Sequence, residues 1–395
     1  MTYDNANQTS PDPQIYGLDV HSATIVISKA PRLGPPEYVK TIPNNTKAIK
    51  AFFKPELEKG AIIHTVYEAG GCGYALDHLL KKLGIHNVVC APSKIVRARG
   101  SKIKNDKVDA NLLARLLRSE VLFGHKELHH VFVPEVMDEA IREYCRRRDT
   151  LQSEVKKVKN QILSLLRRHG AQYDKTKSNW TITHRSWLAT VDLGFWLIRQ
   201  TLDEYIEDLS RLEKRVAEAD KTLIKLRGMW RKAVIAQAIS CLRGFSDLTS
   251  IALVAEIGSF ARFEKAPDLM AYIGLTPSEF SSGNNVTRGR ITKTGNKKVR
   301  TICIEAANHA RKSVRPRTKI AKQAPKGVHQ DIINRAYECE KRMFHKYWLM
   351  VNKGKNTNKA KTAVARELLG FIWNIGLMAE TLLDAGEPEP EKEVA

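Results

Sequence analysis

Short apolar runs and helix-spaced segments alternate over the first 120 residues. The segment 15–30, IYGLDVHSATIVISKA, has apolar runs on both sides of a turn-like DVHS, which predicts a β-hairpin of two mostly buried strands. Further strands are expected at 61–70 and 86–91. Helical spacing occurs at 46–60, 74–84 and 108–118. Strands that alternate with helices predict an α/β domain with a mixed sheet.

From about residue 136 the pattern changes to long, charged segments with helical spacing. Apolar residues of the segment 137–170 recur at alternating steps of four and three, which is heptad spacing: Leu151, Val155, Val158, Ile162 and Leu165. A similar segment covers 195–226, after a polar connection. Two such helices usually pair antiparallel. The hairpin either projects from one subunit or binds a second one, and both readings stay open.

The remainder of the chain predicts a mostly helical domain. Short apolar helices are expected at 248–258 and 269–277, and a closing helix at 359–376. The longest apolar run, 368–379, is interrupted by Asn374 and is shorter than the ~20 residues of a membrane span, so no membrane partner is expected. The expected organisation is a disordered start (1–13), an α/β domain (14–134), a coiled-coil hairpin (135–229), a helical domain (230–384) and a disordered acidic tail (385–395).

Charge then narrows the range of partners. The 395 residues include 65 Lys or Arg and 43 Asp or Glu, a formal net charge of +22 that is typical of proteins that bind polyanions. The six cysteines form no C-x-x-C pair and have no histidines at zinc spacing, which excludes a disulfide framework and a structural zinc site. The first 13 residues lack the features of a signal peptide. A cytoplasmic nucleic-acid-binding protein is expected, associated with the nucleoid when it acts.

Four carboxylates are candidates for metal chemistry. Asp19 lies inside a strand pattern, where a charge is costly, and Glu68 ends another strand. Asp106 and Asp109 begin a helix three residues apart, so their Cβ atoms should lie about 5–6 Å apart. Carboxylate oxygens suit Mg²⁺, or Mn²⁺, and such a site serves phosphoryl transfer. The alternative for Asp106 and Asp109 is ordinary capping of the helix.

Two basic segments surround the candidate chemistry. Residues 91–118 hold eight Lys or Arg and two acids, and 288–322 hold twelve and one. Such segments are expected to bind the phosphates of DNA or RNA. The candidates in the first segment are Lys94, Arg97, Arg99, Lys102 and Lys104. Those in the second are Arg288, Arg290, Lys293, Lys297, Lys298 and Arg300.

A serine pair precedes the second basic segment. Ser281 and Ser282 stand before Gly283, in a turn that lets the backbone approach a phosphate closely. A serine hydroxyl there could attack a phosphodiester, if a base or a metal activates it. The alternative is a turn in which the two serines only bond the backbone. The P-loop pattern is absent from the sequence, so an ATPase is not expected.

Together these segments resemble a known family. GLDVHSATIVIS, YEAGGCGYALDHLL, APSKIVRARGSKIKNDKVDANLLARLLR and YIGLTPSEFSSGNNVTRGRITKTGNKKVR resemble, in order and spacing, the DEDD transposases of bacterial insertion sequences and the related Piv DNA invertases. The resemblance implies a RuvC-like (RNase H-like) N-terminal domain. It places the carboxylate set on Asp19, Glu68, Asp106 and Asp109, and the nucleophile on Ser282, with Ser281 one residue away as the alternative.

The resemblance also implies how such a protein works. Family members are recombinases that excise and insert their element, guided by a structured bridge RNA that pairs with donor and target DNA. Dimers assemble into tetramers through the helical hairpin, and one subunit's carboxylates act with another's serine. Two alternatives stay open: a junction resolvase that hydrolyses DNA with water, and a non-catalytic nucleic-acid-binding protein. A resolvase would need only about the first 150 residues.

Overall fold

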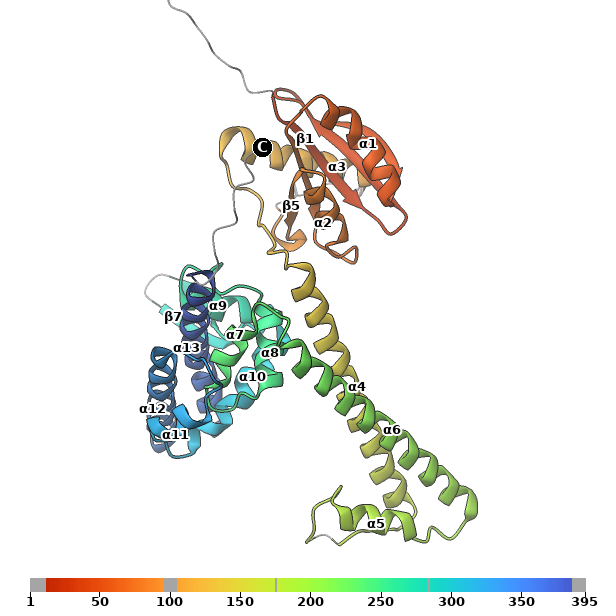
Figure 1. Ribbon diagram of the computed structural model, residues 1–395, viewed down its shortest axis with the longest axis vertical. Coiled ribbons are helices and arrows are strands. Elements are labelled where there is room, and N and C mark those ends of the chain that lie inside the picture. Colours follow the sequence, from red (N-terminus) through yellow and green to blue (C-terminus); the bar gives the residue numbers. More distant parts are fainter. Residues whose placement is uncertain (1–11, 96–104, 175, 283–284, 386–395) are drawn as a thin grey trace, which may run out of the picture. The chain divides into compact units, whose positions relative to one another are not determined.

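The computed structural model divides into two compact units, Met1–Val133 and Pro134–Ala395 (Figure 1). It describes residues 12–95, 105–174, 176–282 and 285–385. The predicted disordered start and tail therefore lie almost wholly outside the described residues. Each unit has its own hydrophobic core, and each is described by itself.

A five-stranded mixed sheet forms the centre of the first unit. Its strand order is β3-β2-β1-β4-β5, with β1 antiparallel to β2 and parallel to β4. The strands are β1 (Gln14–Val20), β2 (Thr24–Ala30), β3 (Glu37–Pro43), β4 (Ile63–Glu68) and β5 (His86–Cys90). The predicted hairpin and the two further strands are confirmed. The edge strand β3 was not predicted, because all its residues but Ile42 are exposed and leave no alternating pattern.

Helices cover both faces of this sheet. They are α1 (Thr46–Glu58), α2 (Ala75–Lys82) and α3 (Asp106–Phe123). Tyr16 and Leu18 of β1 pack with α1 and α2, whereas Ile15 packs with α3 on the other face. Successive side chains of a strand point to opposite faces, so β1 is buried on both sides. The unit is therefore a mixed α/β domain, in agreement with the predicted RNase H-like class.

A long helical hairpin begins the second unit. It pairs α4 (Val136–Arg168) with α6 (Trp196–Leu226), and α5 (Ile182–Thr190) lies in the connection between them (Figure 1). The predicted heptad residues Leu151, Val158, Ile162 and Leu165 are buried between the helices, and Val155 is half-buried beside them. Helix α5 was not predicted, because its segment is mainly polar.

The remaining helices of this unit surround a second core. They are α7 (Ala233–Ser240), α8 (Asp247–Ile257), α9 (Ala266–Ile273), α10 (Lys297–Ala307), α11 (Arg317–Gln323), α12 (Gln330–Asn352) and α13 (Thr357–Ala385). Ile141 and Cys145 of α4 and Leu223 of α6 belong to the same core, so the base of the hairpin is anchored in the helical body. A two-stranded sheet, β6 (Pro277–Ser282) and β7 (Asn285–Ile291), stands where the sequence predicted only a turn.

In the part of the chain that the structure describes, α13 alone is long and apolar enough to cross a membrane. Val364, Leu369 and Ile372 of this helix are fully buried in the core of the second unit. These residues give α13 an apolar face that packs in this core.

Candidate carboxylate site and nucleic-acid interface

A close approach of helix α3 to strand β1 builds the carboxylate site. A Cβ atom at Gly17 would lie 2.1 Å from the Ala110 carbonyl oxygen and 2.4 Å from the Ala114 nitrogen. Only glycine leaves room for a helix backbone at this distance. The contact fixes the first turn of α3, which carries Asp106 and Asp109, beside the end of β1, which carries Asp19.

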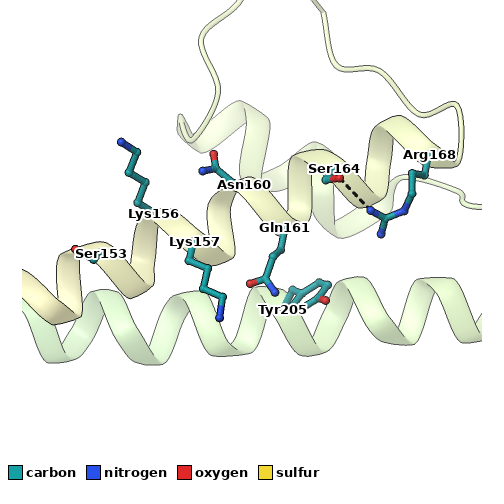
Figure 2. A pocket seen from close by; sticks show the side chains of 8 residues that line it. All are labelled: Ser153, Lys156, Lys157, Asn160, Gln161, Ser164, Arg168 and Tyr205. Atoms are coloured by element: carbon teal, nitrogen blue, oxygen red, sulfur yellow. Dashed lines mark hydrogen bonds between the residues drawn. The ribbon is translucent and has the colours of Figure 1, made fainter.

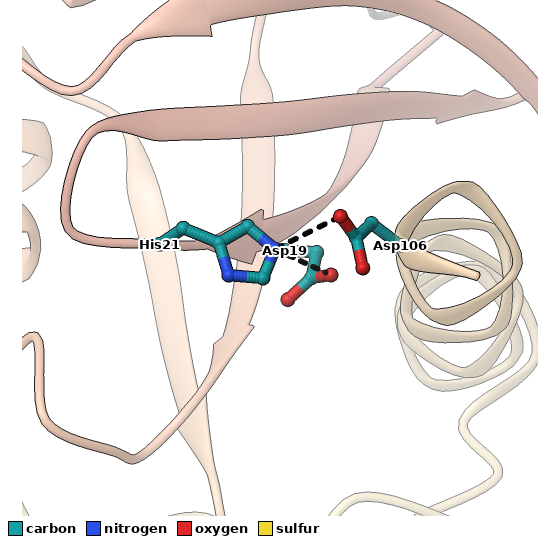
Figure 3. A group of neighbouring side chains, drawn as sticks. All are labelled: Asp19, His21 and Asp106. Carbon is teal, nitrogen blue, oxygen red and sulfur yellow. Dashed lines mark ion pairs between the residues drawn. The ribbon is translucent and has the colours of Figure 1, made fainter. Parts of the chain in front are cut away.

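Three side chains meet at this point (Figure 3). The Nε2 atom of His21 lies 3.3 Å from Oδ2 of Asp19 and 3.2 Å from Oδ2 of Asp106. The possible ligand atoms of the three residues all lie within 4.8 Å of one another. Asp19 is the least exposed of the three, with 23% of its side chain accessible, against 54% for Asp106.

The other two carboxylates act on the same point. Burial raises the pKa of Asp19, and the negative charges of Asp106, Asp109 and Glu68 raise it further, while His21 opposes them. The pairing of Leu18 with Tyr67 in the parallel ladder brings Glu68 level with Asp19 at neighbouring strand ends. The structure therefore brings Asp19 and Asp106 together, and it leaves Asp109 and Glu68 near enough to act on Asp19 electrostatically.

The capping alternative does not account for Asp106. Asn105 is the N-cap of α3, and its side-chain oxygen accepts a hydrogen bond from the Lys107 backbone N–H at 3.1 Å. Asp106 is the first helical residue, and its carboxylate faces His21 instead. Asp109 lies in the first turn, where a negative charge also favours the helix dipole.

The residues present fit a divalent cation. Oxygen ligands from two strands and one helix are the donors that Mg²⁺ and Mn²⁺ prefer. A bound cation would offset both the burial and the neighbouring negative charges that raise the pKa of Asp19. The site thus has both the donors and an electrostatic reason to hold a metal.

His21 is the residue of this cluster that the sequence reasoning missed. The DVHS segment was interpreted as a turn, and no role was assigned to the histidine. His21 follows the end of β1 at Val20 and lies two residues after Asp19, a spacing that places both side chains on one face where the backbone stays extended. That periodicity is the signal that could have identified it.

The predicted nucleophile belongs to the second unit. Ser282 ends strand β6 and pairs with Asn285 of β7, and Ser281 pairs with Val286. The side chains of both serines and residue Gly283 lie outside what the structure describes.

Comparison with known proteins gives the family. A family model described as "Transposase IS116/IS110/IS902 family" matches residues 236–323, and a DEDD transposase model of the IS110 type matches residues 16–170. A putative transposase of Sinorhizobium fredii is 30% identical over 361 residues, which cover 91% of this chain and 87% of that protein. The chain belongs to this transposase family.

Two further relatives carry insertion-sequence names. The transposase for insertion sequence element IS1533 of Leptospira borgpetersenii is 32% identical over 62% of this chain and 69% of its own length. The transposase for IS1111A of Coxiella burnetii is 22% identical over 77% of this chain and 76% of its own length. The family-model match over residues 16–170 includes all four carboxylates. The family-model match over residues 236–323 includes Ser282.

The predicted basic residues of the transposase differ in their surroundings. Lys94 is exposed in a short 3-10 helix, Pro92–Lys94. Arg290, Lys293 and Lys297 are also exposed. Arg97, Arg99, Lys102 and Lys104 fall in the segment 96–104, outside the described residues, as does the side chain of Arg288.

Two of the predicted basic residues have partners within the second unit. Lys298 forms an ion pair with Asp149 of α4. Arg300 donates a hydrogen bond to the Ile273 carbonyl oxygen at 2.7 Å, which ties α10 to the end of α9. These contacts give Lys298 and Arg300 a structural role of their own.

A polar cavity of about 610 Å³ lies along the helical hairpin of the transposase (Figure 2). Figure 2 shows Gln161 beside Tyr205 of α6, and Arg168 donates a hydrogen bond to the Ser164 hydroxyl at 2.9 Å. The cavity is lined by Ser153, Lys156, Lys157, Asn160, Gln161, Ser164, Arg168 and Tyr205. This set holds three basic side chains and no acid, so the lining of the cavity is polar and cationic.

Proposed function

We propose that Asp19, Glu68, Asp106 and Asp109 hold Mg²⁺, or Mn²⁺, and that this transposase cuts and exchanges DNA strands of its insertion sequence. Transposases act on DNA. The observation that supports the proposal is geometric: Asp19, His21 and Asp106 offer ligand atoms within 4.8 Å of one another, and Asp109 and Glu68 lie close enough to act on Asp19 electrostatically. The bound cation would polarise a phosphodiester and neutralise the charge that develops on its oxygens. The carboxylates orient the cation, and His21 fixes two of them.

The proposed nucleophile is Ser282. A bond would form between the serine Oγ and phosphorus as the bond from phosphorus to the leaving sugar oxygen breaks. The serine proton is released, and the leaving oxygen takes up a proton. Because the phosphoserine link conserves the energy of the phosphodiester, strands can be rejoined without ATP. The place of a serine pair at the end of β6, in a segment with basic residues, supports this assignment.

Water is the alternative nucleophile, as in an RNase H-like nuclease or a junction resolvase. The observation that favours it is that the acidic cluster lies within one unit, which the serine does not belong to. A labelled suicide DNA substrate on a denaturing gel separates the two mechanisms. Wild type and Ser281→Ala should form a covalent adduct that maps to Ser282, and Ser282→Ala should form none. Strand exchange by the double alanine variant would exclude the serine mechanism.

The partners belong to the same proposal: donor and target DNA, a bridge RNA, and a homodimer that assembles into a homotetramer through the hairpin. The net charge of +22 supports two nucleic-acid partners. Sequencing of RNA that co-purifies with the protein, and recombination with and without it, tests the guide. Strand exchange that is equally fast without RNA would exclude a guide.

Composite sites give a direct test of assembly. An Asp19→Asn subunit lacks the carboxylate and a Ser282→Ala subunit lacks the nucleophile, so each variant alone should be inactive. If one subunit's carboxylates act with another's serine, mixing the two should restore part of the strand exchange. Light scattering shows whether mixed oligomers have formed. If they form and strand exchange is still not restored, the carboxylates and the serine act within one subunit.

A further inference from the structure

A groove of about 1310 Å³ lies on the helical body of the second unit. One wall comes from strand β7 and the loop after it, and the other from the segment that ends α12 and begins α13. The walls are about 50 residues apart in sequence, and about half of the lining residues lie beyond the matched family region 236–323.

Unneutralised positive charge lines both walls. Arg290 and Lys293 stand on the first wall, and Lys355, Lys359 and Arg366 on the second; all five are exposed. Lys359 and Arg366 are seven residues apart, so they share one face of α13. Within the described residues, no ion pair involves any of these five side chains.

The acid that lines the groove is already neutralised. The Glu367 carboxylate accepts hydrogen bonds from Arg342 and Lys346 of α12. Burial raises the pKa of Glu367, but these two cations outweigh it and hold the pKa below its ordinary value. The charge that the groove offers to a ligand is therefore strongly positive.

The floor between the walls is apolar. Met270, Leu275, Pro277 and Ile291 line it. A duplex presents mainly phosphates to a groove of this kind, whereas an unpaired strand also presents base faces and sugars, which gain from burial on apolar side chains.

We propose that this groove binds a single-stranded polynucleotide, with phosphates on the five cations and bases or sugars on the apolar floor. The position of the groove suggests which part of the strand it holds. Pro277 and Ile291 pair at the base of the β6–β7 hairpin, and Ser282 ends β6 five residues further along. At about 3.3 Å per residue this is roughly 17 Å, a distance that a few nucleotides of an extended single strand can span. Resting on the proposed role of Ser282, the groove then holds the strand that flanks the cut phosphate.

The test compares two variants of the full chain with equal changes in charge. Lys359→Glu with Arg366→Glu alters the groove. Lys353→Glu with Lys361→Glu alters the same part of α12 and α13, at positions that do not line it. Fluorescence anisotropy with a labelled 20-nucleotide DNA strand, the RNA strand of the same sequence and the DNA duplex measures affinity against salt. Thermal melts confirm that both variants fold.

The groove variant should bind single strands at least tenfold more weakly, and its log–log salt slope should shrink by about 1.4, or 0.7 for each phosphate that the groove no longer neutralises. The control should change affinity less than threefold. A larger effect on DNA or on RNA identifies which strand the groove holds. Equal weakening in both variants, weakening confined to the duplex, or displacement of the strand by an equimolar polyglutamate peptide would overturn the inference.

The design separates this inference from the proposed function. If the groove variant binds single strands like wild type, the groove inference falls and the transposition chemistry stands. If wild type binds no nucleic acid, both fall.

Discussion

The two units of this transposase handle charge in opposite ways. In the first, acids from β1, β4 and α3 lie near one another, and burial together with their negative charges raises the pKa of Asp19. In the second, cations from β7, α12 and α13 are spread along a groove, where no acid among the described residues neutralises five of them. Acids that lie close together direct their negative charge at one bound cation. Cations that are spread along a groove can contact the successive phosphates of a nucleic acid. The contrast separates the part suited to chemistry from the part suited to binding.

Removal of one carboxylate should have the largest effect, because it should abolish the chemistry and leave binding unchanged. Asp106→Asn should reduce strand exchange by at least 100-fold, because it removes a proposed metal ligand. Nucleic-acid affinity should stay within about threefold of wild type, since the binding cations are unchanged. Recombination assays and anisotropy on the same preparation measure both. If Asp106→Asn recombines DNA as fast as wild type, Asp106 is not a metal ligand of the site.

Gly17→Ala tests the packing that makes convergence possible. A methyl group at this position overlaps the α3 backbone, so the free energy of unfolding should fall by roughly 3 kcal/mol. The carboxylates of α3 should also move away from Asp19. Thermal unfolding and strand exchange should both be impaired. Gly71→Ala is the matched control, because its added methyl group meets no atom within 4 Å. Equal stability of the two variants would contradict the role of the close approach.

Substitution of His21 tests whether this residue positions the carboxylates of Asp19 and Asp106. His21→Ala removes the group that contacts both Asp19 and Asp106, and strand exchange should fall about tenfold, a typical cost for loss of a group that orients metal ligands. His21→Asn keeps a polar side chain and should recover part of the rate. The assay is strand exchange against metal concentration, where a positioning role predicts a higher metal requirement. An unchanged metal requirement in His21→Ala would argue against that role.

Asp19→Asn should stabilise the metal-free protein by a small amount. The folded state raises the pKa of Asp19, so it binds this proton more tightly than the unfolded state does, and the charged side chain lowers stability as pH rises through the raised pKa. The variant should melt about 2 °C higher than wild type at pH 7, and the difference should vanish below about pH 4. A variant that is less stable than wild type at pH 7 would contradict the repulsion.

The sequence predicted the elements with a clear apolar run or repeat. Strands β1 and β2 were predicted because continuous apolar runs lie on both sides of a turn, and α4 because its buried residues recur at heptad steps. The exposed edge strand β3 and the polar helix α5 lack such a signal. Strand pairing between β6 and β7 was also missed, because glycines and serines in this segment predict a turn.

The candidate site was predictable in its acids but not in its geometry. Asp19 and Glu68 stood out as charges in strand patterns, and the pair Asp106 and Asp109 as acids on one helical turn. Their meeting depends on the close contact between Gly17 and α3, which joins positions about 90 residues apart. The groove likewise joins β7 to α13. Contacts between residues so far apart in sequence depend on the three-dimensional packing, and local sequence patterns do not predict them.

A thermal melt with added metal tests the central claim, that the carboxylate cluster is a divalent-cation site. Mg²⁺ or Mn²⁺ at about 100 times its dissociation constant should stabilise wild type by about 2.7 kcal/mol, because a ligand that binds only the folded state shifts unfolding. Asp19→Asn and Asp106→Asn should lose most of this stabilisation, whereas Lys353→Glu should keep it. Equal stabilisation of wild type and both carboxylate variants would show that the metal binds elsewhere and would contradict the account.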